Sequence, residues 1–240
     1  MPLWAPIEGP LEASRFIQRF NRFLIQVRLE VTGELVDVHM ADPGRLRELL
    51  LPEKRVWLRP ATNPNRKTRW TAVLVESPSG DELVSLDTTL PNRLIRVALQ
   101  HQSLDELEGW TLARAEVPIG GSRLDFLLAK GEDRKLALEV KSVTLVEDGV
   151  AFFPDAVTER GARHVRELAG IAGKAGWEAA VLFVLQRPDA REIRAARSID
   201  PGFASALEEA KAAGVRILGR RCQVSLDRVS LGVRVPVDVG

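Results

Sequence analysis

Two charged side chains stand in a segment that otherwise has the alternation of a buried β-strand. In Leu-Ala-Leu-Glu-Val-Lys, which ends at Lys141, the two leucines and the valine share one face, while Glu139 and Lys141 share the other. A carboxylate and an ammonium are costly inside a sheet unless they are paired or bind a metal. The segment therefore predicts a site in which negative oxygens lie beside a positive charge.

Asp125 is a second carboxylate, one hairpin before Glu139. It lies in a predicted strand over residues 124–129, and Gly131 separates this strand from the next one, over residues 136–146. Adjacent antiparallel strands would bring Asp125 close to Glu139. Two carboxylates and a strand carbonyl form the all-oxygen site that suits Mg²⁺ or Mn²⁺. We therefore expect Asp125 and Glu139 to be the metal ligands.

Lys141 and Glu116 extend this set of catalytic candidates. Lys141 could orient an attacking water or offset the charge of a pentavalent phosphate. Glu116, on a predicted strand over residues 110–117, is a candidate third carboxylate. The pattern D…ExK, with thirteen residues between Asp125 and Glu139, is that of the PD-(D/E)XK nucleases. The alternative is a salt-bridged hairpin at the edge of a sheet.

A predicted helix over residues 158–173 adds a polar stripe. Arg160, His164 and Glu167 share one face by their i, i+4, i+7 spacing, and Arg163 lies beside that face. We expect His164 to belong to the catalytic set, and Arg160 and Arg163 to hold phosphates. A solvated helix face is the alternative.

The elements that must position these residues fall into two groups, and the first group is mainly β. Turn residues separate its short segments. The predicted strands cover residues 23–31, 35–40, 56–58, 70–76 and 82–86, with a short helix over residues 44–50. Five short strands and a small helix are typical of a small closed barrel such as the OB-fold, which often binds single-stranded nucleic acid.

The second group alternates strands and helices. A helix begins near Pro91, an apolar strand covers residues 179–185, and Asp200 caps a helix that ends before Gly214. Further predicted elements are a turn at Gly120-Gly121 and strands over residues 215–218 and 224–226. We predict an α/β domain with a mixed sheet over residues 87–240, after a barrel domain over residues 1–86.

The charge of the chain is unevenly distributed. Its formal net charge is only +1, but residues 15–70 hold twelve Lys and Arg against six Asp and Glu. This local excess could neutralise phosphates. Two tryptophans of the same region, Trp57 and Trp70, are either stacking platforms for bases or part of the barrel core.

Composition excludes several classes of protein. Apolar residues make up 45% of the chain and charged residues 28%, which is ordinary for a globular protein. We find no apolar run that could cross a membrane and no signal peptide, so we expect no membrane partner. Cys222 is the single cysteine, and the three histidines are far apart, which excludes a disulfide and argues against a zinc site. We expect a reducing, cytoplasmic location.

Several longer motifs extend over nearly the whole chain. They are Arg19-Phe20-Asn21-Arg22-Phe23, Pro43-Gly44-Arg45-Leu46, Ser122-Arg123-Leu124-Asp125-Phe126, Glu139 to Leu145, Phe153 to Gly161, and His164 with Glu167 and Leu168. In these motifs the sequence resembles the sugar fermentation stimulation protein A family. The resemblance implies an N-terminal OB-fold domain, a C-terminal PD-(D/E)XK nuclease-like domain and DNA binding. It carries the acidic pair over to Asp125 and Glu139, with Lys141 as the third member.

Together these patterns predict a DNA-binding protein of low sequence specificity with a divalent-metal-dependent phosphodiesterase site. The candidate DNA contacts are Arg19, Arg22, Arg45, Arg123, Arg160 and Arg163. The alternative is a non-catalytic DNA-binding regulator of sugar-utilisation gene expression that retains a nuclease fold. A scaffold module for another protein or for RNA is a third hypothesis. Strandedness and a homodimer are left open.

Overall fold

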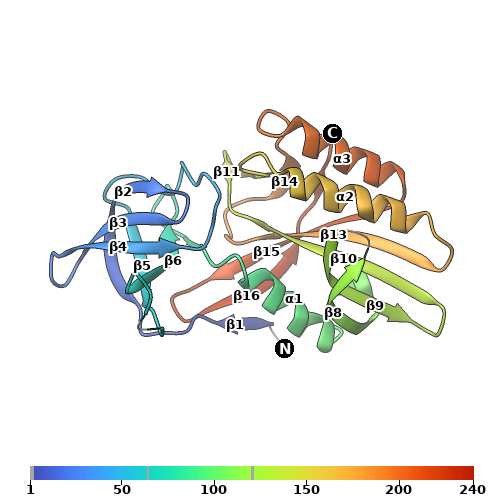
Figure 1. Cartoon of the computed structure of the whole chain (residues 1–240), viewed down its shortest axis with the longest axis horizontal. Helices are drawn as coiled ribbons and strands as arrows, with labels where there is room; N and C mark the ends of the chain where they lie inside the picture. The colour runs from blue at the N-terminus through green and yellow to red at the C-terminus, as the bar shows by residue number, and fades with distance from the viewer. Residues whose placement is uncertain (1–2, 64, 120–121) are drawn as a thin grey trace.

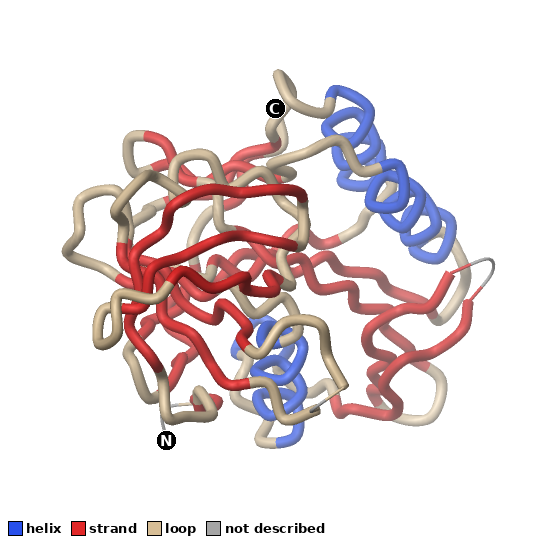
Figure 2. Tube along the Cα trace, turned by 60° about the vertical axis from the view of Figure 1, so that its left-hand side comes forward, coloured by secondary structure: helices blue, strands red, loops and turns tan. Residues whose placement is uncertain are grey.

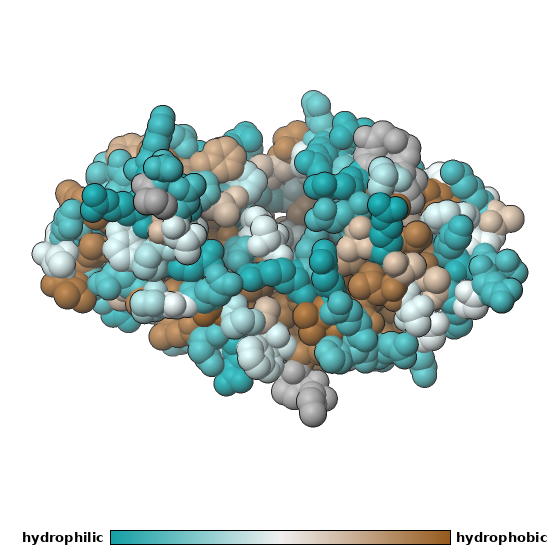
Figure 3. All heavy atoms as spheres, turned by 60° about the horizontal axis from the view of Figure 1, so that its bottom comes forward, coloured by the Kyte–Doolittle hydropathy of each residue, from teal (hydrophilic) through white to brown (hydrophobic). Residues whose placement is uncertain are grey.

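Two lobes lie side by side in the computed structural model (Figure 1), which describes residues 3–63, 65–119 and 122–240. The predicted turn at Gly120-Gly121 falls outside these residues. The smaller lobe is a β-barrel, and the larger one combines two sheets with three α-helices among the described residues. A space-filling view shows a hollow between the two lobes (Figure 3). No helix within the described ranges has the length and apolarity needed to cross a bilayer.

The barrel consists of six strands in the order β4-β3-β2-β5-β6-β7, and parallel pairing of β4 with β6 closes it. The strands are β2 (Glu12–Asn21), β3 (Leu24–Leu29), β4 (Leu35–Met40), β5 (Arg55–Pro60), β6 (Trp70–Glu76) and β7 (Leu83–Ser85). In β3 the buried residues are Ile25, Val27 and Leu29, as the alternation predicts. Their side chains pack in one apolar core with the other barrel strands.

The structure differs from the sequence-based prediction at two places in the barrel. Strand β2 was not predicted, because its alternation is interrupted by small and polar residues. The helix predicted over residues 44–50 is a series of turns. Leu46 has a φ of 48°, which a right-handed helix cannot accommodate. Its carbonyl accepts hydrogen bonds from the N–H groups of Leu49 and Leu50, so only a single turn forms.

A seven-stranded mixed sheet forms the centre of the larger lobe, in the order β1-β16-β15-β13-β10-β9-β8. The strands are β1 (Trp4–Pro6), β8 (Thr111–Ile119), β9 (Ser122–Lys130), β10 (Arg134–Val143), β13 (Trp177–Leu185), β15 (Arg216–Val224) and β16 (Arg228–Arg234). β13 is parallel to both β10 and β15, and the outer pairs are antiparallel. β1 pairs with β16, so the first strand of the chain lies in the sheet of the larger lobe. Residues 225–227, partly predicted as strand, form the turn between β15 and β16.

Helices cover both faces of this sheet (Figure 2). They are α1 (Leu90–Gln100), α2 (Glu159–Ala172) and α3 (Pro201–Ala212), with a short 3₁₀ turn, η1 (Asp105–Leu107). Leu136 and Leu138 of β10 pack with α1, while Ala137 packs in the core formed with α2 and α3. β10 is therefore buried on both faces, and Glu139 and Lys141 lie on the α2 side.

A second, four-stranded sheet lies beside α3 and follows the order β11-β12-β14-β17. Its strands are β11 (Val146–Glu147), β12 (Val150–Phe153), β14 (Glu192–Ala195) and β17 (Val237–Asp238). β12 is followed by residues 154–158, which lead into α2 and face the barrel in the recess described below. This small sheet therefore positions residues 154–158, the segment of the larger lobe that faces the barrel.

Candidate functional site

Asp125 lies where the pairing of β9 with β10 stops. The last paired residues are Phe126 and Leu138, and beyond them Oδ2 of Asp125 accepts the N–H of Val140 at 2.7 Å. Oδ1 accepts a hydrogen bond from Nδ2 of Asn92, on α1, at 2.7 Å. The side chain of Asp125 thus takes the place of the β9 backbone group that would otherwise pair with Val140. Because the N–H and C=O of a strand residue face the same neighbour, the Val140 carbonyl also faces this side.

Glu139 is buried, with only 4% of its surface exposed, and its two oxygens differ. Oε1 is 2.6 Å from Nζ of Lys141 and 2.7 Å from Nδ1 of His164. Oε2 is also buried, yet it has no hydrogen-bond partner among the described residues. A buried carboxylate oxygen without a partner is costly, so Oε2 is the atom at which a cation would compensate burial.

His164 connects Glu139 to Arg160. Nε of Arg160 is 3.4 Å from Nε2 of His164. A guanidinium only donates, so Nε2 accepts, and in the neutral ring Nδ1 carries the hydrogen that is donated to Glu139. Thr158 starts this helix, since its Oγ1 accepts the N–H of Gly161 at 3.0 Å. The predicted stripe of Arg160 and His164 on α2 therefore faces the acidic pair.

Burial and the neighbouring charge of Glu139 both raise the pKa of Asp125, and burial is the larger cause. Hydrogen bonds from Val140 and Asn92 oppose this rise. Two carboxylates held close together in a poorly solvated site favour protonation of one of them. A divalent cation removes that preference, because it stabilises both charges.

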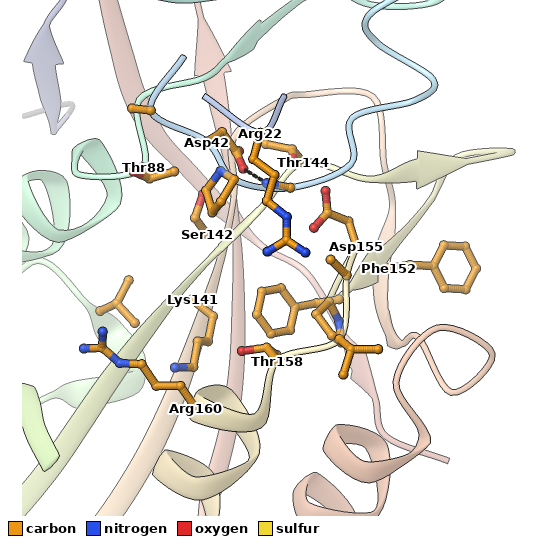
Figure 4. A pocket seen from close by; sticks show the side chains of 18 residues that line it. Arg22, Asp42, Thr88, Lys141, Ser142, Thr144, Phe152, Asp155, Thr158 and Arg160 are labelled. Carbon is orange, nitrogen blue, oxygen red and sulfur yellow. Dashed lines mark hydrogen bonds between the residues drawn. The ribbon is translucent and has the colours of Figure 1, made fainter. Parts of the chain in front are cut away.

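A recess of about 630 Å³ lies between the two lobes, and Val140 and Lys141, which follow Glu139 in β10, are among the residues that line it (Figure 4). The barrel contributes Arg22 and residues 41–44, and the larger lobe contributes residues 140–142, Thr144, residues 152–158 and Arg160. In the close view, the side chain of Arg22 extends from the barrel toward the larger lobe, and those of Lys141 and Arg160 lie near each other on the opposite side. Asp125 and Glu139 are not among the residues that line the recess, so the acidic pair adjoins it through Val140 and Lys141, and positive charges lie on both walls of this cleft.

A smaller recess of about 370 Å³ adjoins the first one. Both are lined by Arg22, Pro43, Gly44, Ala156 and Val157, and the smaller one adds Arg19, Arg45 and Arg47. The side chains of Arg22, Arg45 and Arg47 form no hydrogen bond or ion pair within the described part of the chain. These three guanidiniums are thus available to an anionic ligand, and they continue the basic wall of the cleft.

Arg19 differs from the other arginines of this recess, because its guanidinium binds the backbone. It donates to the carbonyls of Asn21 at 3.1 Å, Arg22 at 2.9 Å and Arg45 at 2.6 Å. Burial lowers its pKa. Arg19 therefore holds two loops of the barrel in place, and its contact with a phosphate stays a prediction.

Asp155 joins the two lobes at the wall of the cleft. Burial raises the pKa of its carboxyl, although the backbone N–H groups of Leu46 and Arg45 oppose the rise. Oδ2 of Asp155 is packed so closely on Gly44 that a Cβ at this position would overlap it. Gly44 therefore allows a residue of the larger lobe to approach the backbone of the barrel.

The remaining predicted residues are found outside the two recesses. Glu116 has a side chain that is 62% exposed and lies 3.6 Å from Arg123, so neither residue is brought to Glu139. Arg163 is exposed on α2. Trp57 is buried in an apolar cluster, and Trp70 is half-buried in a 1,140 Å³ groove on the barrel that also includes Arg66 and Lys67.

Three residues of the site were missed in the sequence. Asn92 binds Asp125 from α1, Asp155 joins the lobes, and Asp42 accepts the N–H of Gly44 at 2.8 Å. Of these three residues, only Asp155 lies in a motif that the sequence singled out; Gly44, the partner of Asp42, lies in another. Asn92, one residue after the predicted helix start at Pro91, carries no signal of its own, because its partner lies 33 positions away.

The donor set at Asp125 and Glu139 fits a hard divalent cation. Glu139 offers the unpartnered Oε2, Asp125 a second carboxylate and Val140 a backbone carbonyl. No group of three or more His, Cys, Asp or Glu residues with metal-binding geometry occurs among the described residues. A cation that binds through one or two carboxylates, waters and a substrate phosphate, as Mg²⁺ commonly does, needs no larger cluster.

Comparisons with known proteins cover both lobes. Residues 17–86 match the family model of the SfsA N-terminal OB domain, and residues 89–228 match that of the sugar fermentation stimulation protein RE domain. These matches confirm the predicted fold class: an N-terminal OB barrel followed by a mixed α/β, nuclease-like domain.

Relatives of this chain match almost its full length. A sugar fermentation stimulation protein homolog from Shouchella clausii is 48% identical and covers 96% of this chain and 98% of its own length. A homolog from Moorella thermoacetica is 45% identical, with 93% and 94% covered. The solved structure of Pyrococcus furiosus SfsA in complex with Ca²⁺ is 28% identical, has a TM-score of 0.85 and covers 99% of both chains. The chain therefore belongs to the sugar fermentation stimulation protein (SfsA) family.

Proposed function

We propose that this protein is a divalent-metal-dependent phosphodiesterase that binds and cleaves DNA with low sequence specificity. The observation that carries the proposal is the buried Oε2 of Glu139, which has no partner among the described residues although Lys141 and His164 both bind Oε1. The RE description of the matched family model and the Ca²⁺ held by the Pyrococcus furiosus relative support it. Mg²⁺ or Mn²⁺ is the cation that we expect in this chain.

Asp125 and Glu139 would hold the cation, with the Val140 carbonyl as a further oxygen donor. When bound, such an ion polarises a phosphoryl oxygen and lowers the pKa of a bound water. His164 fixes the rotamer of Glu139 by donating to Oε1, and this leaves Oε2 directed to the ligand. Lys141, held 2.6 Å from Oε1, would orient the attacking water or stabilise charge that develops on the phosphate.

Positioning of the DNA would fall to arginines on both walls of the cleft. Arg160 lines the recess beside Lys141, and Arg22 faces it from the barrel. Phosphate contacts of this kind bind without reading base sequence, which agrees with the expected low specificity. Arg45 and Arg47 extend the same wall along the smaller recess.

The test compares Glu139→Gln with the wild-type protein in two measurements. Titration with Mn²⁺ in a calorimeter should show one site in the wild type and at least about tenfold weaker binding in the variant. Cleavage of labelled DNA should require the metal, cease in EDTA, and fall at least about a hundredfold in Glu139→Gln, since a ligand rather than an outer partner is lost. Glu132→Gln, an exposed residue in the β9–β10 turn, is the matched control.

A non-catalytic DNA-binding regulator predicts a different result. Such a protein would bind labelled DNA with and without metal, cleave none, and show the same behaviour in the wild type and Glu139→Gln. That outcome, or wild-type cleavage in Glu139→Gln, would overturn the proposed mechanism.

A further inference from the structure

Two exposed phenylalanines flank Arg22 at the turn between β2 and β3. Phe20 and Phe23 are each 50% exposed, although most large apolar side chains of the barrel strands are in its core. The proposed chemistry uses neither ring. An aromatic pair at a fixed position on the surface is typical of a binding element rather than of a folding requirement.

The turn that carries these rings is held by several hydrogen bonds. Oδ1 of Asn21 accepts the N–H of Phe23 at 2.9 Å. The guanidinium of Arg19 binds the carbonyls of Asn21 and Arg22, and also that of Arg45 in the neighbouring loop. The motif Arg19-Phe20-Asn21-Arg22-Phe23 therefore uses its first and third residues to fix the backbone. The two rings and Arg22 remain free to contact a ligand.

Unpartnered positive charge continues from this turn into the cleft. Arg22 lines both recesses, and Arg45 and Arg47 line the smaller one. Aromatic side chains beside a basic groove are the features by which proteins bind single-stranded nucleic acid, since bases stack on the rings while phosphates follow the cations. A duplex does not offer this contact, because its bases are stacked on one another.

The dimensions of the cleft also favour an unpaired strand over a duplex. The recess above Lys141 measures about 630 Å³, which is in the range of about 300–1,000 Å³ that accommodates small ligands. Asp155 joins its two walls at Gly44, and Glu48 of the barrel lies 3.8 Å from the buried Arg187 of the larger lobe. A flexible unpaired strand can enter a recess of this size with one or two nucleotides, whereas a rigid duplex would leave its phosphates outside.

We propose that Phe20 and Phe23 stack on unpaired bases of a DNA strand whose phosphates lie along Arg22, Arg45 and Arg47. The strand then continues between the lobes to Lys141, whose Nζ contacts Glu139. The substrate of the site is accordingly single-stranded DNA, or an unpaired segment of a duplex. The cleavage part of this inference rests on the proposed function, and the binding part does not.

Binding in EDTA tests the inference without cleavage. Fluorescence anisotropy compares a labelled oligonucleotide of about 16 nucleotides, the upper end of OB-fold site sizes, with the same strand annealed to its complement. The wild type should bind the single strand more tightly. Phe20→Ala/Phe23→Ala should lose about 5-fold to about 150-fold of that affinity for each stacked base, and little of the duplex affinity. Val31→Ala, another exposed apolar residue of the barrel at 81% exposure, is the matched control.

A second measurement needs no variant. An oligonucleotide that contains 2-aminopurine should change its fluorescence when the wild-type protein moves that base from its neighbours onto a ring. For the anisotropy experiment, thermal unfolding checks that the double variant Phe20→Ala/Phe23→Ala is folded. Equal affinity for the single strand and the duplex, or wild-type affinity in the double variant, would overturn the inference. Cleavage of fully paired DNA as fast as of single strands would also overturn it and leave the proposed phosphodiesterase intact. Ring-dependent binding of single strands without any cleavage would instead remove the phosphodiesterase and support the binding site.

Discussion

Nδ1 of His164 lies 2.7 Å from Oε1 of Glu139, and both side chains are 5% exposed. The contact joins α2 to β10 across the buried face of the sheet. It orients the carboxylate so that Oε1 is occupied and Oε2 is free. His164, which the sequence places on the polar stripe of α2, thereby decides which oxygen is available to a cation.

Replacing His164 should weaken metal binding at Glu139 without removing a metal ligand. We expect His164→Ala to lower metal affinity and DNA cleavage by about 10- to 100-fold, as is usual when an outer partner of a ligand is lost. His164→Asn retains an N–H donor near the position of Nδ1 and should recover part of the loss. Mn²⁺ calorimetry and cleavage rates measure both effects. An alanine variant with wild-type metal affinity would show that Glu139 is oriented by other contacts.

Arg22 and Arg47 should contribute to DNA affinity through phosphates. Each alanine substitution should weaken binding on all sequences, and the slope of log affinity against log salt should become shallower by about 1, because fewer counterions are released. Binding curves at several salt concentrations in EDTA measure this slope. Lys211→Ala, on the last turn of α3 and outside both recesses, is the control. An unchanged slope in Arg22→Ala would remove this residue from the binding surface.

Gly44 should be the least tolerant glycine of the interface between the lobes. In Gly44→Ala the added Cβ would overlap Oδ2 of Asp155, so we expect a loss of about 1–3 kcal/mol in the free energy of unfolding. Gly170→Ala, in α2, has nothing within 4 Å of the added Cβ and should gain about 0.5–1 kcal/mol. Chemical denaturation of the two variants gives the comparison. Equal stability of the two would mean that Asp155 can move away without cost.

Asp42 should make the stability of the protein depend on pH. Burial raises its pKa to about 6, and the nearby Asp155 also contributes. The folded protein therefore binds a proton more tightly than the unfolded chain, and stability is highest below the unfolded pKa and falls as pH rises toward about 6. Asp42→Asn keeps an acceptor for the N–H of Gly44 and carries no charge.

We expect Asp42→Asn to be more stable than the wild type by about 1–3 kcal/mol at about pH 8 and to match it at about pH 4. Urea unfolding at the two pH values measures the difference. The opposite sign, a variant that is less stable at high pH, would show that the Asp42 charge is favourable through Arg19.

The strands and helices of the larger lobe were largely predictable, because local patterns specify them. The apolar run at residues 179–185 is the core of β13, and Asp200 caps α3 at Pro201 as expected. The proximity of Asp125 to Glu139 was also predictable, since a hairpin through Gly131 leaves little choice of register. Residues 44–50 could not be predicted from local signals, because their conformation depends on contact with Asp155 in the other lobe.

The sequence by itself determined the types of elements, the acidic pair with its lysine, and the positive charge of the barrel, because alternation and short-range spacing depend on neighbours along the chain. Only the tertiary structure decided that Arg19 binds backbone carbonyls while Arg22 faces the cleft, and that Glu116 is exposed while Asn92 reaches Asp125. These roles depend on contacts between residues far apart in the chain. Burial and the choice of partner arise when the two lobes pack, and no local pattern encodes them.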